Sequence, residues 1–353
     1  MNLKKLRNKI DKVDKQIVEL LSQRAGYTLS IGDLKRKANK GIYAPDRETF
    51  ILRRLKKLSK SPLSKDALES IYREIMSSSL SLEKPLEIAY LGPKATFTHL
   101  AALKKFGSQV KYIDCDSISD VFLEVEKGSC DYGVVPLDNS IEGAVTHTLD
   151  MLMDYPLNIC SEIILEISHN LLSNYKKEAI KKIYSNPQVF AQCRIWIERN
   201  LPKAERIEVS STARAAELSK RQRNSSCIAS LLAAKEYALK VVARDIEDSP
   251  HNVTRFLVIG KYDIPPTGQD KTSIIFSIKD RVGALHDMLL PFKRHKINLT
   301  KIESRPSKKK AWDYYFFVDL AGHHQDSRVK KAIKELEDKC TFLKILGSYP
   351  TAE

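Results

Sequence analysis

The sequence predicts a multidomain protein, in which an all-α N-terminal domain is followed by a two-lobed α/β domain and a smaller α+β domain. Three observations predict this order. Apolar residues recur at helical spacing over residues 1–84, short β-rich runs alternate with helical stretches over residues 86–264, and two strand–helix units follow one another over residues 271–353. A chain of 353 residues is also too long for one simple core.

The N-terminal domain is predicted to contain three helices. Apolar positions recur at helical spacing from Leu3 to residue 34 and predict a first helix that ends near Ala38. A second helix is expected from Asp46 to about Ser59, and a third follows Ser64, whose hydroxyl suits an N-cap. Because a lone helix of this length has little to pack on, we expect it to bury its apolar seam against a second copy of the chain.

A cation interrupts the apolar seam of the first helix. Steps of seven residues from Ile10 lead to Ile17, then Arg24, then Ile31. A buried cation is costly unless an anion compensates it. Further charged residues occur near the same predicted core: Arg7, Lys35, Arg47 and Glu48. Since arginine forks suit carboxylates, the pattern indicates a dicarboxylate ligand inside the helical domain.

The central block places polar side chains at the ends of predicted strands. Asn139 and Ser140 follow the run "VVPLD", and Thr254 and Arg255 precede the strong strand "FLVIG". A third polar turn, "YSNPQVFAQC", contains Ser185 and Gln192. Ligand clefts of open α/β folds form at such strand ends, so the three loops together predict a binding cleft.

The C-terminal block has the element order of a ferredoxin-like module. After the linker "PPTGQD", strands are expected at 272–278, 297–304, 312–320 and 342–347, with helices at 283–295 and 327–339. This βαββαβ order has no obvious catalytic cluster and is typical of a ligand-sensing or assembly module.

Composition excludes several classes of protein. Six cysteines are scattered without a CxxC pair, which argues against a disulfide framework or a zinc site and fits a reducing cytoplasm. No apolar run is long enough to span a bilayer, and the N-terminus lacks the apolar core of a signal peptide. We therefore expect a cytoplasmic protein with no metal, no cofactor and no membrane partner.

The N-terminal domain resembles the AroQ-type chorismate mutases through "LRNKIDKVDKQIVELLSQR", "GDLK", "IYAPDRE" and "REIMSSSLSLE". The resemblance implies an intertwined helical homodimer that converts chorismate to prephenate. It also implies that the substrate carboxylates are held by Arg7 from the partner chain, Arg24 and Arg47. Lys35 would contact the ether oxygen and Glu48 a ring hydroxyl, while Ser79 and Glu83 face the site.

Glu83 departs from the glutamine that many relatives carry. Only a protonated carboxyl can donate to the ether oxygen, so we expect mutase activity to fall as Glu83 ionises.

The central block resembles prephenate dehydratase over its whole length, through "AYLGPKATFTHLAA", "VVPLDNSIEGAV", "NPQVFAQC", "STARAA", "CIAS" and "HNVTRF" in this order. The implied reaction turns prephenate into phenylpyruvate without a cofactor. Thr254 would help the ring hydroxyl leave as water, and the implied substrate-binding residues are Asn139, Ser140, Ser185, Gln192, Thr254 and Arg255. The chain departs from common versions at Lys94–Ala95, Asp138 and Asn186. Ala95 is the most doubtful of these, because alanine adopts glycine-type conformations at a cost.

The C-terminal block resembles the ACT domain attached to dehydratases, through "RVGALHDML" and "INLTKIESRP". The resemblance implies a feedback site for L-phenylalanine between paired modules. Its residues would be Gly283, Ala284 and Leu285 at a helix start, and Glu303, Ser304 and Arg305 at the end of the facing strand.

The charge distribution keeps a second class of function open. The net charge is +15, and residues 1–84 carry 20 Lys and Arg against 10 Asp and Glu. A ligand-sensing DNA-binding regulator would also be basic, but these cations follow the apolar seam and not an exposed recognition face. No nucleic-acid partner is therefore expected. A dehydratase that acts mainly on arogenate is the remaining alternative.

Overall fold

The computed structural model describes residues 2–38, 41, 43–58, 62–279, 281–306 and 314–352. The chain divides into two compact units, which are described separately. One comprises Met1–Leu86 with Phe106–Lys111, and the other comprises Glu87–Lys105 with Tyr112–Glu353. The predicted turn over 305–310 and the predicted strand start at 312 lie largely outside the described residues.

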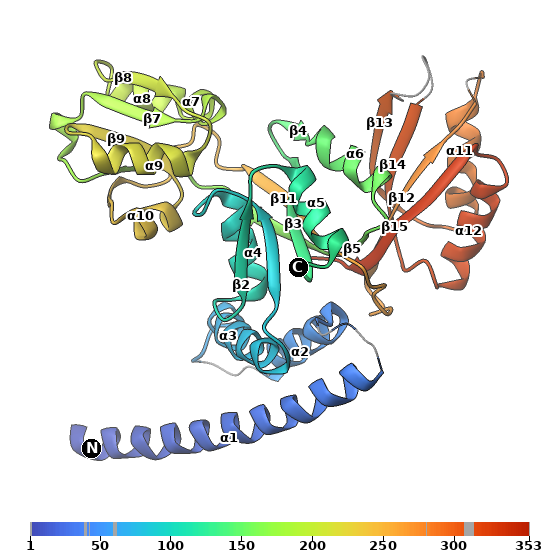
Figure 1. Cartoon of the computed structure of the whole chain (residues 1–353), viewed down its shortest axis with the longest axis horizontal. Coiled ribbons are helices and arrows are strands. Elements are labelled where there is room, and N and C mark those ends of the chain that lie inside the picture. The colour runs from blue at the N-terminus through green and yellow to red at the C-terminus, as the bar shows by residue number, and fades with distance from the viewer. Residues whose placement is uncertain are drawn as a thin grey trace. The chain divides into compact units, whose positions relative to one another are not determined.

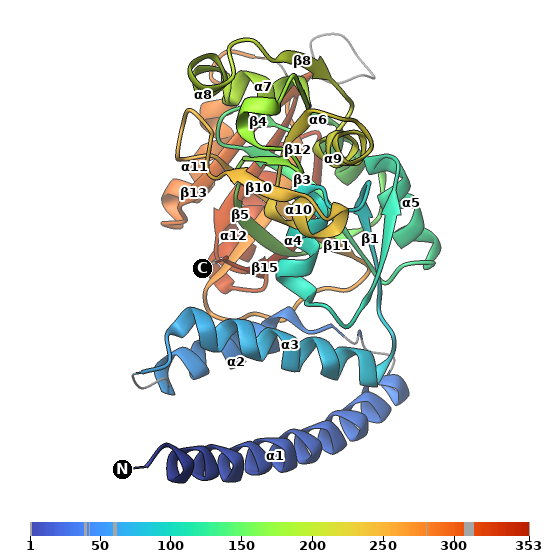
Figure 2. The same ribbon diagram turned by 90° about the vertical axis from the view of Figure 1, so that its left-hand side faces the viewer.

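The helical unit contains α1 (Leu3–Lys37), α2 (Pro45–Leu58) and α3 (Lys65–Glu83). The side chain of Ser64 accepts a hydrogen bond from the backbone N–H of Ala67, as expected of an N-cap. Figure 2 shows α2 and α3 lying side by side. The C-terminal end of α1 approaches α3 closely at Gly32, where a Cβ atom would lie 3.2 Å from Cγ of Glu83. The absence of a side chain at Gly32 therefore allows the two helices to meet.

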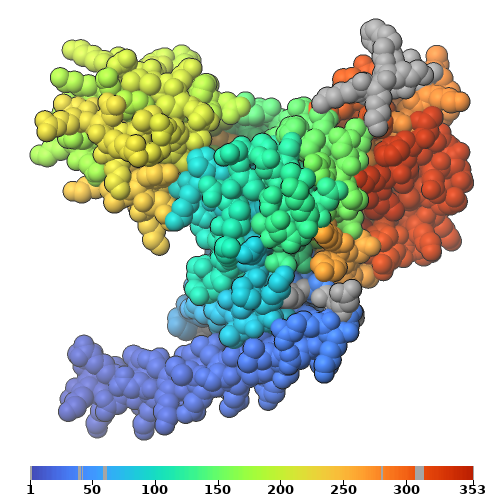
Figure 3. Space-filling view, in the orientation of Figure 1, coloured from blue at the N-terminus to red at the C-terminus, as the bar shows by residue number. Residues whose placement is uncertain are grey.

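Most of α1 has no apolar partner among the residues that the structure describes. Its buried residues are Thr28 and Gly32, whereas Ile10, Ile17 and Leu20 are 58%, 48% and 62% exposed. Figure 3 shows the N-terminal part of α1 as a rod that stands clear of α2 and α3. An apolar seam of this length left in water is the feature that a partner helix would cover.

The first α/β lobe is built on a mixed sheet. Its strand order is β2-β1-β3-β11-β5, with β4 on β3, and its strands are β1 (Glu87–Leu91), β2 (Lys111–Cys115), β3 (Tyr132–Asn139), β4 (Gly143–Ala144), β5 (Asn158–Glu166) and β11 (Val253–Gly260). Its helices are α4 (Phe97–Phe106), α5 (Ile118–Lys127) and α6 (Thr146–Asp154). β11 runs antiparallel between β3 and β5, so both of its edges are paired, and its residues from Arg255 to Gly260 are buried.

The second lobe has a sheet of its own, with strand order β10-β6-β9-β7-β8. Its strands are β6 (Asn170–Ser173), β7 (Lys182–Ser185), β8 (Glu205–Glu208), β9 (Ser225–Ala229) and β10 (Lys240–Ala243). Its helices are α7 (Pro187–Gln192), α8 (Arg194–Asn200), α9 (Thr212–Arg221) and α10 (Leu231–Tyr237), with a short 3₁₀ turn at Lys177–Ala179. The chain passes from one lobe to the other between β5 and β6 and returns between β10 and β11, which confirms the predicted two-lobed domain.

The C-terminal module has the predicted βαββαβ order: β12 (Asp270–Ser277), α11 (Ala284–Arg294), β13 (Leu299–Pro306), β14 (Tyr314–Ala321), α12 (Ser327–Glu337) and β15 (Phe342–Pro350). The strands form an antiparallel sheet in the order β13-β14-β12-β15, coloured orange to red in Figure 1. One face of this sheet packs on α11 and α12 through residues such as Phe276 and Val318. The other face, with Phe317, Leu346 and Tyr349, shares one hydrophobic core with the first lobe.

Candidate functional site

The helical unit brings four predicted residues together between α1 and α3. Nη1 of Arg24 donates a hydrogen bond to Oγ of Ser79, and Nζ of Lys35 lies 2.9 Å from Oε2 of Glu83. Arg24 and Lys35 are eleven residues apart, which is close to three helical turns and about 16 Å along one face of α1. Glu83 is 8% exposed, so its carboxylate and the ammonium of Lys35 form a largely buried ion pair.

The other three predicted mutase residues lie differently. On α2, Oε2 of Glu48 accepts a hydrogen bond from the Tyr43 hydroxyl at 3.1 Å, and the exposed guanidinium of Arg47 lies 5.1 Å from the ring centre of Phe50. Arg7 is exposed and lies seventeen residues before Arg24, or about 25 Å along the helix. Within one chain, Arg7 is therefore separated from the Arg24–Lys35 face.

The two α/β lobes line a cleft of about 1000 Å³. Its lining includes Asn139 and Thr254 from the first lobe, His169 just after β5, Gln192 from the second lobe, and Asn252 just before β11. Asn139 and Thr254 are paired residues on neighbouring strands β3 and β11. Two of the three polar loops picked out in the sequence therefore meet Gln192 of the third at one cleft.

Hydrogen bonds orient the polar groups of this cleft. Oδ1 of Asn139 accepts from the backbone N–H groups of Ile141 and Glu142, so its Nδ2 must point the other way. That nitrogen donates to Oγ1 of Thr254 and to Oδ1 of Asn252, both at 2.7 Å. Asn252 in turn donates to Oε1 of Gln192 at 3.0 Å. Thr254 is therefore the acceptor of a hydrogen bond from Asn139. Its own O–H hydrogen takes no part in that bond or in the bond from Asn139 to Asn252.

His169 is a cleft residue that the sequence analysis missed. Its Nε2 lies 2.8 Å from Oε1 of Gln192, which also accepts from Asn252, so Nε2 carries the hydrogen. The ring is 1% exposed and packs edge-on against Phe97. Burial lowers the pKa of His169, although the bond to Gln192 and the carboxylate of Glu247 act in the opposite direction. His169 is therefore a neutral imidazole whose Nδ1 has no hydrogen-bond partner among the described residues. No spacing pattern in the sequence singled out this residue, which directly precedes β6.

Three predicted dehydratase residues do not direct their polar atoms into the cleft. Oγ of Ser140 donates to the carbonyl of His251 and accepts the N–H of Val253, which fastens the loop to the start of β11. Ser185 is fully buried, and its hydroxyl donates to the carbonyl of Ile228 at 2.9 Å. The guanidinium of Arg255 lies across the strand from Thr254, with Nη1 2.5 Å from Oδ2 of Asp319 and Nε 2.8 Å from Oε2 of Glu162. Direct contact of Arg255 with a substrate in the cleft does not fit this geometry.

The loop at Lys94–Ala95 adopts a backbone conformation that favours glycine. Ala95 has φ +71°, is fully buried, and donates its N–H to Nδ1 of His99 at 3.1 Å. Alanine therefore takes the left-handed conformation here, at a cost of about 1–2 kcal/mol.

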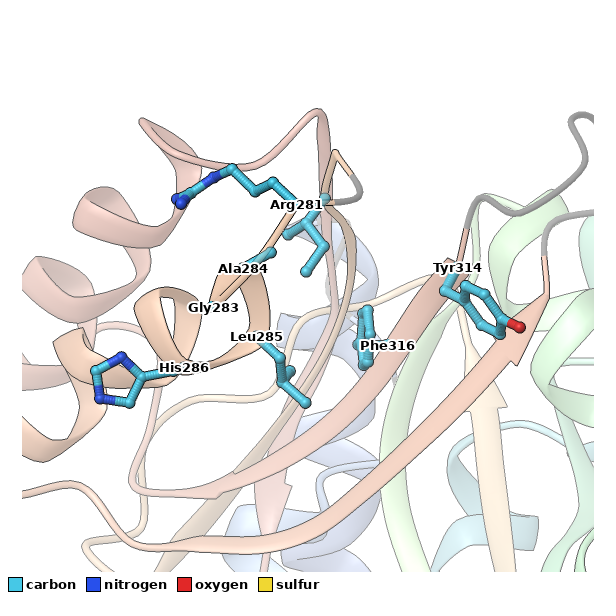
Figure 4. Close-up of a pocket in the computed structure, with 8 residues that line it drawn as sticks. Arg281, Gly283, Ala284, Leu285, His286, Tyr314 and Phe316 are labelled. Carbon is cyan, nitrogen blue, oxygen red and sulfur yellow. The ribbon is translucent and has the colours of Figure 1, made fainter.

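A pocket of about 280 Å³ lies at the start of α11 in the C-terminal module. Gly283, Ala284 and Leu285 line it together with Tyr314 and Phe316 of β14. In Figure 4, Leu285 points toward the strand that carries these two rings, whereas His286 points away.

The second predicted effector stretch lies partly on the other face of the sheet. Arg305 forms an ion pair with Asp150 of α6 at 2.8 Å, and Glu303 lines the same interface. Ser304 is exposed. Within one chain the two effector stretches are therefore not brought together in one pocket.

No described helix combines the length and the apolar character that crossing a membrane requires. Among the same residues, no group of three or more His, Cys, Asp or Glu side chains could hold a metal ion.

Comparison with known proteins matches each region to a family. Residues 6–84 match the chorismate mutase type II model, residues 88–264 the prephenate dehydratase model, and residues 272–338 the ACT domain model. The chain is similar to the protein named bifunctional chorismate mutase/prephenate dehydratase of Aquifex aeolicus, with 52% identity over 99% of this chain and 98% of the relative. The protein of the same name from Pseudomonas aeruginosa is 45% identical over 99% and 98% of the two chains.

A solved structure agrees with this assignment. The prephenate dehydratase of Arthrobacter aurescens, determined in complex with L-Phe, superimposes with a TM-score of 0.71 and 34% identity, over 76% of this chain and 90% of that one. The order of the three matched models and the full-length likeness to the Aquifex and Pseudomonas proteins show that this chain belongs to the family of bifunctional chorismate mutase/prephenate dehydratases with a C-terminal ACT domain.

Proposed function

We propose that the chain rearranges chorismate to prephenate in its helical unit and then converts prephenate to phenylpyruvate in the cleft between its α/β lobes. The hydrogen bond from Asn139 to Thr254, inside a cleft that both lobes line, is the observation that carries the second activity. Arogenate is the competing substrate for the cleft, but a mutase domain on the same chain supplies prephenate.

The mutase reaction needs positioning and charge, and no covalent intermediate. Arg24 and Arg47 would bind the carboxylates, and Lys35 would stabilise the ether oxygen as its negative charge grows. Lys35 already contacts Glu83, so a substrate ether oxygen bound at Lys35 would also lie near the Glu83 carboxyl. Ser79 holds Arg24, and Glu48, fixed by Tyr43, would bind the ring hydroxyl.

The working form of the helical unit is proposed to be a homodimer. The apolar seam of α1 is exposed over most of its length, and Arg7 lies too far along the helix to serve the site of its own chain. A second α1 packed on this seam would bury the apolar residues and bring its Arg7 to the Arg24–Lys35 face.

Dehydration of prephenate breaks two bonds and takes up one proton. The bond between the ring and its carboxylate breaks, carbon dioxide leaves, and its electron pair makes the ring aromatic as the C–OH bond breaks opposite. The departing hydroxide needs a proton to leave as water. Thr254 would donate a hydrogen bond to this hydroxyl, because its oxygen accepts from Asn139 and its own O–H hydrogen can point to the substrate.

A single experiment with the full chain tests both activities. Purified protein is supplied with chorismate, and prephenate and phenylpyruvate are followed with time. Thr254→Ala should accumulate prephenate, while Thr254→Ser, which keeps the hydroxyl, should retain turnover. Undiminished phenylpyruvate formation by Thr254→Ala would remove Thr254 from the mechanism, and failure to consume chorismate would remove the mutase assignment.

The ACT domain is proposed to bind L-phenylalanine and inhibit the dehydratase. The pocket beside Gly283, Ala284 and Leu285 has aromatic walls from Tyr314 and Phe316 that suit a phenyl ring. Completion of this site by residues 303–305 of a partner module would place the effector between two copies, and a cytoplasmic location fits the free thiols of the chain.

A further inference from the structure

Two ion pairs connect the ACT domain to the strands that carry the dehydratase site. Lys301 of β13 pairs with Asp138 of β3, and Asp319 of β14 pairs with Arg255 of β11. Lys301 and Asp319 are opposite each other in the β13–β14 ladder, and Asp138 and Arg255 are opposite each other in the β3–β11 ladder. We call these four residues the charge clamp.

Each clamp residue of the catalytic lobe is the immediate chain neighbour of a site residue. Asp138 precedes Asn139, and Arg255 follows Thr254. Because successive side chains of a strand point to opposite faces, Arg255 faces the ACT domain while Thr254 faces the cleft. A shift of the Arg255 side chain that moves its backbone must therefore move Thr254 as well.

A bulge lies beside the strand ends that carry Asn139 and Thr254. The β3–β11 ladder changes register between Arg255 and Phe256, which pair with Asp138 and Pro136, so Leu137 is left over as a bulge. A bulge interrupts the ladder and bends the strand. Beyond the bulge, β11 stays paired with β5, and the end of β3 is paired with the two-residue strand β4. Side-chain contacts at Asp138 and Arg255 add to this backbone pairing and set the direction of the bent strand ends.

The Arg255 end of the clamp is rigid and dry. Asp319 is fully buried, its Oδ1 accepts from Ser273, and the Tyr349 hydroxyl accepts from Nη2 of Arg255 at 2.9 Å. On the lobe side, Oε2 of Glu162 lies 2.8 Å from Nε of Arg255 in an ion pair and also 2.8 Å from Nζ of Lys271. Every charged group in this cluster contacts a group of opposite charge. The contacts therefore fix the orientation of these side chains as well as their position.

We propose that Lys301 and Asp319 of the ACT domain are positioning residues for dehydration: through Asp138 and Arg255 they hold Asn139 and Thr254 in the geometry that the reaction needs. The inference rests on the proposed role of Thr254. Since β13 also carries residues 303–305 of the predicted effector site, the same strand that would meet phenylalanine holds the catalytic loop.

The test measures both activities of full-length variants. Lys301→Met and Asp319→Asn should lower the dehydratase kcat on the order of 10- to 100-fold, as expected for a misplaced reacting group. KM for prephenate should stay within about twofold, since no substrate contact is removed. Mutase activity of the same preparations serves as the internal standard, and Lys301→Arg, which keeps the charge, should restore most of the dehydratase kcat.

A matched control separates the clamp from the interface as a whole. Lys344 of β15 donates to the carbonyls of Leu152, Met153 and Tyr155 at the end of α6, in the same interface. Its hydrogen bonds among the described residues are therefore to α6 and its C-terminal end, and not to β3 or β11. Lys344→Met should leave the dehydratase kcat within about twofold of the parent value. A loss equal to that of Lys301→Met would show a general effect of weaker docking and would overturn the proposal.

A double variant guards against misfolding at the buried end. Arg255→Met with Asp319→Leu replaces the pair by apolar side chains, which buried sites usually tolerate. Suppose that the double variant has the parental Tm and that its dehydratase kcat is reduced by no more than that of Asp319→Asn alone. The two residues then act as one unit. A folded double variant with parental kcat would overturn the proposal, even where Thr254→Ala is inactive. Conversely, an active Thr254→Ala would refute the role of Thr254. The kcat values of the Lys301 and Asp319 variants would not be affected by that result, so the two failures can be distinguished.

Discussion

Gly347 of β15 lies against the backbone of the first lobe, and its replacement by alanine should loosen the ACT domain from that lobe. The residue has φ +147°, a conformation that side chains rarely adopt. A Cβ atom at this position would lie 2.3 Å from the carbonyl oxygen and 2.8 Å from the amide nitrogen of Ile159 on β5. Both contacts are with backbone atoms of a β-strand, so neither can be relieved by a side-chain rotation.

The expected loss of stability in Gly347→Ala has two parts, one from the backbone conformation and one from the close contacts. Holding alanine in a conformation reserved for glycine costs about 1–3 kcal/mol. Forcing a methyl group into a closely packed interface costs about 1–3 kcal/mol more. The sum of about 2–6 kcal/mol corresponds to a decrease in Tm of roughly 5–20 °C for a unit of this size.

Gly268 provides the control, because it has φ +87° and no atom within 4 Å of an added Cβ. Gly268→Ala should therefore show the conformational cost alone, about 1–2 kcal/mol. Differential scanning calorimetry of both variants measures the shifts, and loss of dehydratase activity after heating identifies the transition of the unit that contains Gly347. Equal decreases in Tm for the two variants would mean that the ACT sheet moves away from β5 without a loss of stability. That result would refute the argument that Gly347 is required by its close contact with Ile159.

Three further results are expected. The α/β unit should lose stability as the pH falls below 6.5, because burial lowers the pKa of His169 and of His99 in the folded chain while the unfolded chain takes up protons freely. Urea unfolding midpoints at pH 7.5 and 5.5 measure this, and His169→Gln should reduce the difference; an unchanged difference would exclude His169 as a cause. Glu83→Gln should change the dependence of the mutase rate on pH, because an amide can donate a hydrogen bond to the ether oxygen at any pH, so identical pH–rate profiles would contradict the role of Glu83. Ile17→Lys should weaken self-association measured by sedimentation, since Ile17 belongs to the exposed seam, whereas Lys15→Ala on the opposite side of α1 should leave it unchanged. Equal sedimentation of both variants would argue against a dimer built on α1.

Most of the fold could be predicted because each region repeats a local pattern. The helical spacing of apolar residues placed α1 and α3, and the alternation of strands and helices predicted the later domains. The first residues of α2 show the limit of such patterns. The helix begins at Pro45 and not at Asp46, because a proline fits the first turn of a helix, where its missing N–H would have no partner.

The site was harder to predict where it depends on the direction in which a side chain points. Thr254 and Arg255 are adjacent in a strand, so both could not face one cleft, and strand geometry alone should have separated them. His169 was missed for a different reason: a single histidine carries no spacing signal, and it acquires meaning only beside Gln192 and Asn252. Contacts between residues far apart in sequence, such as Lys301 with Asp138, leave no local trace.

The interface between the ACT domain and the first lobe combines two kinds of contact with different consequences. The shared apolar core around Phe317 and Leu346 is non-directional, so it can hold the two sheets together while tolerating small displacements. The buried pair of Arg255 and Asp319 is directional, and apolar residues of similar size would stabilise the interface as well or better. Charges therefore add little to adhesion here, and what they add is a fixed geometry. That geometry is imposed beside Thr254, on a strand whose two faces meet both the cleft and the ACT domain.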